Sequence, residues 1–344
     1  TVEFLWKYYQ LTRSQPVYDE LMKAGGFIAC FIHPDGTCGG DYGSRNTDFF
    51  FPAAFEQMKS TIPVANKILR LYYSALQNNL TPHPAIIDDR YFCFTYGNFI
   101  QAMLNYGQGE NIPDNQFTGE TKSFPAAGLY TYSGNRFYLI ANTNKNSVFK
   151  IYDTLNKTLI AADAGYLCKL SDGKLAGTQH LSPTIKTELT ENNGQIIIQT
   201  ANWFYYLPDN PDLAKVLLPF RLLNYTFGRF NLLNLWVNRK LKKYLFSSHN
   251  KLNLHLKRRM IISPDKIVVE DLIANPSRIK NASLELTAYL IPQHVSYSQF
   301  SYNFNLTAPI IDLSDKFNNY QQLSVIRSFT CKENWDCDIQ ITGN

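Results

Sequence analysis

The spacing of apolar residues changes once along this chain, and this change limits the folds open to it. Up to about residue 104, apolar residues recur every three or four positions, as they do on one face of an α-helix. Two such stripes are Val17, Leu21, Ala24, Ile28 and Phe31, and Ala65, Ile68, Tyr72 and Ala75. The first part of the chain is therefore predicted to form several antiparallel helices.

From residue 123 onward, the chain has the features of short strands separated by turns. LYTY and RFYLIA lie on either side of SGN at 133–135, and QIIIQT follows an Asn-Gly pair at 193–194. Regular strand and turn spacing of this kind favours antiparallel sheets stacked as a sandwich. Residues 106–122 between the two patterns are rich in Gly, Asn, Asp, Pro and Gln, which is linker composition. We predict a helical domain over 1–105, a linker over 106–122 and a β-sandwich over 123–344.

Two further helices are expected. The Asp88-Asp89 pair suits the positive end of a helix dipole. A helix opening there would carry Phe92, Tyr96, Phe99 and Met103 on one face. Within the β region, residues 211–247 repeat Leu233, Val237, Leu241 and Leu245 every four positions, beside the basic run NRKLKK. This segment is predicted to be an inserted basic amphipathic helix that packs against the edge of the sandwich, with a membrane-surface role as the alternative.

The composition is that of a globular protein, with 344 residues of which 45% are hydrophobic and 18% charged. The net charge of +5 gains meaning only where cations cluster, as in NRKLKK at 238–243 and KRR at 257–259. Such clusters suit an anionic polysaccharide, a nucleic acid or a lipid headgroup, or form a solvated basic face. Because the basic residues are few and no recognition motif is present, we expect no nucleic-acid partner.

No run of about 18 apolar residues occurs, so no transmembrane segment is predicted. The six cysteines contain no CxxC pair, and only Cys331 and Cys337 lie close enough in sequence to suggest a local disulfide. We expect a periplasmic or secreted protein, with a cytoplasmic location as the alternative. The oligomeric state is left open by the sequence.

The run HPDGTCGGDYGSRN at 33–46 lies between two helical segments and is the strongest candidate for a functional loop. GxGxxG and Walker patterns are absent, which argues against a nucleotide site. The run places a phenol, Tyr42, three residues before a guanidinium, Arg45, with Asn46 beside it. A phenol can exchange a proton, and a guanidinium can hold a carboxylate through two hydrogen bonds.

This loop resembles the toroid loop of heparinase II/III-like and alginate-type polysaccharide lyases. The resemblance is specific over residues 34–46, continues into PAAFE at 52–56, and extends loosely to the order of helices before sheets. It implies an incomplete (α/α) toroid followed by a large antiparallel β-sandwich, and a uronic-acid-containing glycan cleaved by β-elimination. By this resemblance Tyr42 matches the general acid and Arg45 an arginine that positions the uronate. The family's neutralising Asn or His from an earlier toroid helix has no counterpart before Pro34.

Elimination from a uronate needs a base near C5, donors facing the carboxylate, and an acid for the departing O4. Tyr42 is expected to be the acid, on the helical wall of a wet cleft between the two domains. Arg45 or Asn46 would face the carboxylate, and the substrate-binding candidates are Asn46, Asp41 and His33. His180 is the first choice as base, with His33 in reserve.

We expect no catalytic metal, since Arg, Asn and His can neutralise a uronate. His249 and His255 are weak candidates for a zinc site, and a structural zinc or calcium is the cofactor alternative. Two other functions remain open: a non-catalytic carbohydrate-binding relative, and a toroid-type glycoside hydrolase. The hydrolase would use two carboxylates among Asp35, Asp41 and Asp48.

Overall fold

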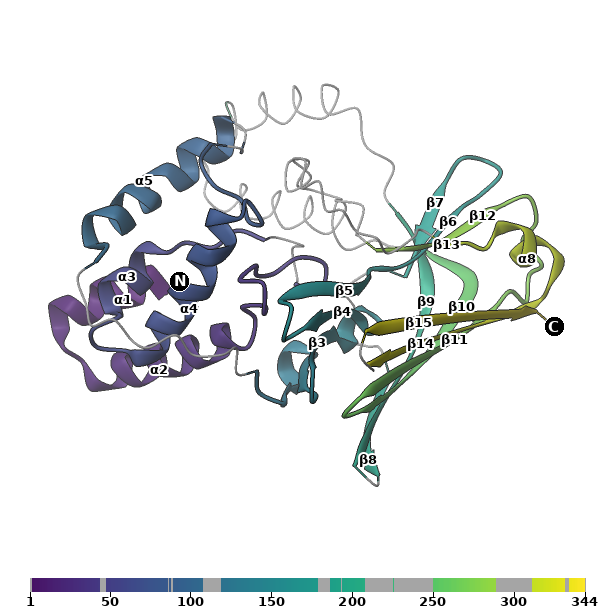
Figure 1. The fold of residues 1–344 in the computed structure, drawn as a ribbon. Helices are drawn as coiled ribbons and strands as arrows, with labels where there is room; N and C mark the ends of the chain where they lie inside the picture. Colours follow the sequence, from purple (N-terminus) through teal and green to yellow (C-terminus); the bar gives the residue numbers. More distant parts are fainter. Residues whose placement is uncertain are drawn as a thin grey trace.

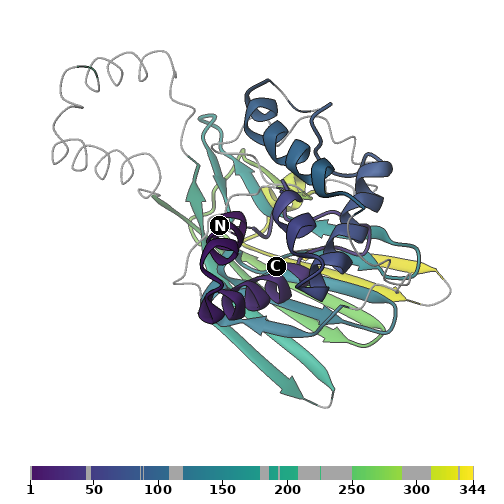
Figure 2. The ribbon, with the colours of Figure 1, turned by 90° about the vertical axis from the view of Figure 1, so that its left-hand side faces the viewer.

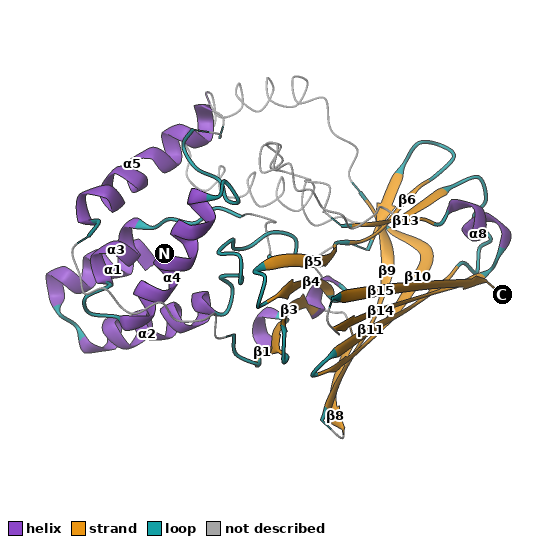
Figure 3. Cartoon of the chain, in the orientation of Figure 1, coloured by secondary structure: helices purple, strands orange, loops and turns teal. Residues whose placement is uncertain are grey.

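Three layers make up the described structure, which is a computed structural model (Figure 1). The model describes residues 2–43, 48–85, 87, 89–107, 119–178, 186–192, 194–207, 225, 250–288, 311–331 and 334–343. Short helices gather at one end, a five-stranded sheet lies in the middle, and a larger sheet lies at the other end (Figure 3). Seen from the helical side, the helices lie in front of the strands (Figure 2).

The helical layer is built from five helices before the first strand. They are α1 (Val2–Thr12), α2 (Gln15–Ala29), α3 (Ala53–Met58), α4 (Pro63–Gln77) and α5 (Asp89–Asn105). Proline stands in the first turn of α2 and of α4, where a missing N–H costs no hydrogen bond. The stripe predicted for α4 is confirmed, because Ala65, Ile68, Tyr72 and Ala75 are all buried. These helices share one core around Trp6, Leu21, Phe55 and Tyr72.

The apolar face predicted for α5 is only partly covered. The helix begins where the carboxylates predicted it, at Asp89, but Tyr96 is 46% exposed and Met103 is 76% exposed. Phe4 and Leu11 of α1 are also largely exposed. Apolar periodicity therefore predicted the buried side of α4, whereas for α5 it predicted the helix but not how far its apolar face would be covered.

The middle layer is the sheet β1-β2-β3-β4-β5, in which every pair is antiparallel. Its strands are β1 (Lys122–Phe124), β2 (Leu129–Ser133), β3 (Phe137–Asn142), β4 (Val148–Asp153) and β5 (Thr158–Asp163). The short 3-10 helices η1 (Pro125–Ala127) and η2 (Thr143–Lys145) connect β1 to β2 and β3 to β4. All six residues of β3 are buried. Its unbroken apolar run is typical of a strand covered on both faces.

The larger sheet runs β13-β12-β6-β7-β9-β10-β11-β14-β15, with β8 also paired to β9. Its strands are β6 (Gly165–Lys169), β7 (Leu175–Gly177), β8 (Lys186–Asn192), β9 (Gln195–Tyr206), β10 (Lys251–Ser263), β11 (Lys266–Ala274), β12 (Ser283–Thr287), β13 (Ile311–Asp312), β14 (Gln322–Cys331) and β15 (Trp335–Gly343). Helix α8 (Ser314–Asn319) lies between β13 and β14 in sequence. Inward and outward residues alternate strictly along β10 and β11.

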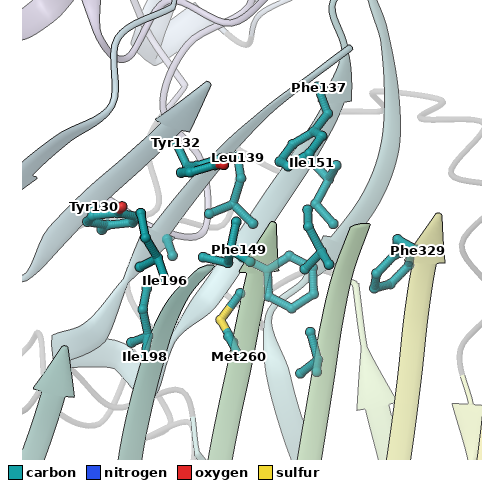
Figure 4. Packing of buried hydrophobic residues seen from close by; sticks show 14 of the residues in the cluster. Tyr130, Tyr132, Phe137, Leu139, Phe149, Ile151, Ile196, Ile198, Met260 and Phe329 are labelled. Atoms are coloured by element: carbon teal, nitrogen blue, oxygen red, sulfur yellow. The ribbon is translucent and has the colours of Figure 1, made fainter. Parts of the chain in front are cut away.

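The two sheets pack face to face through one apolar cluster (Figure 4). Phe137, Leu139 and Phe149 come from the middle sheet, and Met260 and Phe329 come from the larger one. A second cluster gathers Tyr166, Phe204, Leu254, Leu284, Phe317 and Val325, all from the larger sheet and α8. Strands far apart in the sheet order can share this core only if the sheet curls back on itself.

A buried ion network joins the two sheets beside these cores. Arg258 of β10 donates from Nε to Asp271 Oδ1 at 2.6 Å and from Nη2 to Asp163 Oδ2 at 2.9 Å. Arg327 of β14 contacts the same two carboxylates, and Tyr166 donates its hydroxyl proton to Asp271 at 2.7 Å. Burial alone would raise the pKa of Asp271, but the two guanidinium groups hold it below its usual value. Two cations and two anions therefore balance one another in the interior.

The predicted fold class, an incomplete (α/α) toroid followed by a β-sandwich, is wrong. The described structure is mostly β, its antiparallel sheets are curled, and no toroid of paired helices is present in the described ranges. Each apolar stripe predicts one helix but carries no information on how several helices would close around an axis. The inserted helix expected over 211–247 falls almost entirely outside the described residues.

The suggested disulfide is also wrong, because neither Cys331 nor Cys337 forms a disulfide. Cys331 pairs with Trp335 across β14 and β15, whereas Cys337 pairs with Phe329. Among the described helices, none is both long and apolar enough to span a membrane.

Replacing Arg258 by methionine should destabilise the fold strongly. The change leaves Asp163 and Asp271 buried with one cation fewer, which costs about 3 to 5 kcal/mol in comparable cases. Arg259→Met is the matched control. Arg259 pairs with Glu270 at the surface, and 43% of its side chain is exposed. The control should cost less than about 1 kcal/mol. Urea unfolding of the two variants measures both values, and equal costs would rule out the network as a major source of stability.

Candidate functional site

The loop predicted to carry function lies between the helical layer and the middle sheet. Tyr42 of the loop and the two residues Cys30 and Phe31 shortly before it form an apolar cluster with Tyr138 and Val148 of that sheet. Tyr138 donates its hydroxyl proton to the Cys30 carbonyl at 2.9 Å. An isolated bridge between Ile32 and Cys38 folds the loop back on itself. The loop is thus part of the interior, packed on both sides.

Two of its glycines have a positive φ and lie close to other elements. Gly36 has φ +82°, and a Cβ there would lie 1.9 Å from the Leu71 carbonyl oxygen of α4. Gly40 has φ +95°, and a Cβ there would lie 2.5 Å from Lys150 Nζ of β4. A side chain at Gly36 would meet both the backbone of α4 and an unfavourable φ, whereas at Gly40 the neighbour is the flexible end of a lysine and the φ is the main obstacle. The glycine-rich composition therefore lets the loop touch a helix on one side and a strand on the other.

A buried hydrogen-bonded cluster holds the two ends of the loop together. His33 Nε2 lies 2.8 Å from the Tyr42 hydroxyl, and its Nδ1 lies 2.6 Å from Thr37 Oγ1 and 2.8 Å from the Tyr152 hydroxyl. The Gly39 N–H donates to the Tyr42 hydroxyl oxygen at 3.0 Å. The Tyr152 ring stacks on His33 with 4.6 Å between ring centres. The imidazole is thus enclosed by loop and strand.

Burial sets the protonation of this cluster. Desolvation lowers the pKa of His33 well below its usual value, and nearby Lys150 acts in the same direction. Desolvation also raises the pKa of Tyr42 and of Tyr152 well above the usual value. A tyrosinate facing an imidazolium would place two charges in the interior, so the neutral pair is favoured. Tyr42 therefore keeps its proton at physiological pH.

The η2 turn and the residue before it clamp the loop apex. Asn142 donates from Nδ2 to the Tyr42 carbonyl at 2.6 Å. Lys145, which is 2% exposed, donates from Nζ to the carbonyls of Asp41 at 2.8 Å and Gly43 at 2.5 Å. Burial lowers the pKa of Lys145 to about 8, against an opposing effect of Asp41. A cation is therefore held beside the point where the chain enters residues 44–47.

Of the residues predicted for the site, the structure brings Tyr42 and His33 into direct contact and places Asp41 at the Lys145 clamp. Four other candidates, Arg45, Asn46, His180 and His249, lie outside the described residues.

The expectation that the Tyr42 hydroxyl faces a wet cleft is wrong. Tyr42 is 3% exposed, and its hydroxyl is surrounded by His33, Gly39 and the Phe31 carbonyl. The reason is packing: the loop lies against the middle sheet, so its aromatic side chain fills the interface. The sequence could not show which strands would cover the loop.

The hydrolase alternative would use carboxylates of this region, and at least one of them, Asp35, accepts hydrogen bonds within the loop. Asp35 Oδ1 accepts the backbone N–H of Thr37 at 2.9 Å and the Thr37 hydroxyl proton at 2.7 Å. Burial raises the pKa of Asp48 to about 6. A hydrolase needs two carboxylates facing each other across a cleft, and Asp35 instead has its Oδ1 within a turn.

His255, the described half of the weak zinc candidate, contacts the Trp203 ring in a tilted arrangement. Within the described part of the chain, no group of three or more His, Cys, Asp or Glu is arranged to hold a metal ion.

Sequence reasoning missed Thr37, Tyr152, Asn142 and Lys145. The role of Thr37 could have been predicted from the sequence, because an Asp-x-Thr pattern in a glycine-rich turn indicates an Asx turn. The other three come from β3, β4 and their connection, about 100 or more positions later in the chain. No local pattern links such distant residues.

Comparison with known proteins adds little. No protein-family model matches the sequence, and no curated protein matches it. Among solved structures, an alpha-mannosidase from Enterococcus faecalis V583 is similar over 65% of this chain and 26% of that chain, with 9% sequence identity and a TM-score of 0.27. A likeness this weak does not bear on the fold or the function.

Because its hydroxyl is buried, Tyr42→Phe should destabilise the protein. The change deprives His33 Nε2 and the Gly39 N–H of a partner, and a buried polar group left unpaired costs about 1 to 3 kcal/mol. Tyr8→Phe is the control, since Tyr8 is 54% exposed, and it should cost less than about 0.5 kcal/mol. Chemical denaturation decides the matter, and a neutral Tyr42→Phe would show that the hydroxyl is solvated.

Lys145 should make stability depend on pH above neutrality. Its folded pKa of about 8 lies below the ordinary lysine value of 10.5, so the unfolded chain binds more protons between these values and stability rises with pH. From pH 7.5 to 9.5 the wild type should gain about 2 kcal/mol relative to Lys145→Met. Parallel denaturation series at both pH values measure the gain, and an unchanged difference would mean that Lys145 titrates normally.

Proposed function

We propose that this chain binds a uronate-containing glycan where the 33–43 loop meets the η2 turn. The observation that carries the proposal is the Lys145 ammonium, buried and bonded to the carbonyls of Asp41 and Gly43. Arg45 follows Gly43 by two positions in the sequence. A fixed cation thus contacts the last described residues before the arginine of the lyase-like motif in the sequence.

Electrostatics supports an anionic ligand at this junction. Burial lowers the pKa of the Lys145 ammonium, and a ligand carboxylate nearby would raise that pKa and release free energy. Lys150 Nζ lies 3.4 Å from the Gly39 carbonyl, so a second lysine of the middle sheet faces the same loop. The resemblance of residues 34–46 to polysaccharide lyases favours a uronate over other anions.

Cleavage by β-elimination is the second candidate, and one observation favours it. Tyr42 retains its proton and lies 2.8 Å from a neutral histidine, the residue types expected for proton transfer to a leaving oxygen. For this reaction the buried hydroxyl has to become accessible to the glycan. Binding and cleavage are therefore tested separately.

Titration calorimetry with a polyuronate and with the same polymer after reduction of its carboxyl groups tests the binding proposal. The polyuronate should bind at least about tenfold more tightly, since a charge-assisted contact contributes about 1.5 to 3 kcal/mol. Its affinity should fall as the pH rises through about 8, where Lys145 loses its proton. In Lys145→Met this pH dependence should disappear. Equal affinity for the two polymers would eliminate a uronate site.

The ultraviolet absorbance of the unsaturated product tests the elimination. If Tyr42 is the acid, Tyr42→Phe should lower turnover by about 10² to 10⁴ while the KM changes little, provided that the variant is folded at the assay temperature. Tyr8→Phe should retain full turnover. Polyuronate binding without any absorbance change would leave the chain a glycan-binding protein.

A further inference from the structure

The Thr37 hydroxyl lies at the centre of the buried cluster. Its Oγ1 is 2.7 Å from Asp35 Oδ1 and 2.6 Å from His33 Nδ1. The Tyr152 hydroxyl lies 2.8 Å from the same ring nitrogen. Thr37 is 9% exposed and His33 is fully buried. A threonine hydroxyl has one proton and two lone pairs, so these contacts fix the direction of each hydrogen bond.

Asp35 determines where the Thr37 proton goes. Its Oδ1 already accepts the backbone N–H of Thr37 at 2.9 Å, so this oxygen acts as an acceptor and takes the hydroxyl proton as well. Oγ1 can then only accept from His33 Nδ1. If the imidazole proton were on Nε2 instead, lone pairs on Oγ1 and Nδ1 would face each other across 2.6 Å.

We propose that Thr37 selects the Nδ1–H tautomer of His33 and thereby the direction of the hydrogen bond to Tyr42. With Nδ1 protonated, Nε2 accepts, so the Tyr42 hydroxyl donates to His33 and its oxygen accepts the Gly39 N–H. Tyr42, His33, Thr37 and Asp35 then form one directional chain. Thr37 is a positioning residue for the proposed glycan site, and only this last clause rests on the proposed function.

Loss of the Thr37 hydroxyl should reverse the chain. The Tyr152 hydroxyl is already 2.8 Å from Nδ1 and has a proton to donate. The imidazole proton would move to Nε2, which would donate to the Tyr42 oxygen. The Tyr42 proton would then turn to the Phe31 carbonyl, which lies 3.4 Å away.

Nitrogen-15 NMR of histidine-labelled full-length protein distinguishes the two tautomers, because a protonated and an unprotonated ring nitrogen have widely separated shifts. The wild type and Tyr152→Phe should show His33 protonated on Nδ1. Thr37→Val, which is nearly isosteric, should show it protonated on Nε2, and Thr37→Ser should restore the wild-type pattern. A wild type protonated on Nε2, or a folded Thr37→Val with an unchanged tautomer, would overturn the inference. The wild-type spectrum tests it even if Thr37→Val fails to fold.

Glycan affinity provides the functional readout. Thr37→Val should bind the polyuronate about three- to tenfold more weakly than the wild type, and Thr37→Ser should bind within about twofold of it. Unchanged affinity in a folded Thr37→Val would remove the positioning role. If the wild type itself binds no polyuronate, the proposed function and the positioning role both fail, whereas the tautomer assignment is decided by NMR alone.

Discussion

The position of the loop depends on the ion network between the two sheets. Arg258 binds the carboxylates of Asp163 and Asp271. It also donates from Nη1 to the carbonyls of residue 146 at 3.5 Å and residue 147 at 3.1 Å, which are Asn and Ser. Both residues have positive φ, near +59° and +54°, a conformation that needs such external support. They follow directly after Lys145, whose ammonium clamps the loop apex. The intersheet charges therefore fix the η2 turn, and the turn fixes the loop.

Burial gives this loop order at the expense of reactivity. Tyr42 and His33 would be a plausible acid and base if they faced solvent, but desolvation moves the pKa of each away from neutrality. The proton of Tyr42 is directed to His33, within the loop. In contrast, desolvation brings the pKa of Lys145 to about 8, closer to physiological pH. The same low-dielectric environment thus moves the pKa of Tyr42 and of His33 away from neutrality and the pKa of Lys145 towards it.

Local pattern was sufficient for the elements and insufficient for their arrangement. The stripe around Ala65 and Tyr72 predicted α4, and the alternation in KIVVEDLIA predicted β11, because both signals depend on neighbours in sequence. Local patterns could not show whether the helices form a toroid, because the closing of several helices into a ring depends on contacts between elements. Likewise, the loop motif drew attention to Tyr42 and His33, which do meet. Their burial depends on β3 and β4, which the motif does not encode.

The strands that pack on the loop are synthesised long after the loop itself. Tyr152, the strand partner of His33, is synthesised 119 positions after it, and Tyr138, which holds the Cys30 carbonyl, 108 positions after that residue. During translation the helices can pack together before any strand of the middle sheet exists, because domains tend to form from the N-terminal end. Until β3 and β4 have been synthesised, the ring of Tyr42 lacks the strands that cover it in the folded protein. The loop therefore reaches its buried state only when the middle sheet is complete, after the helices before it have been made.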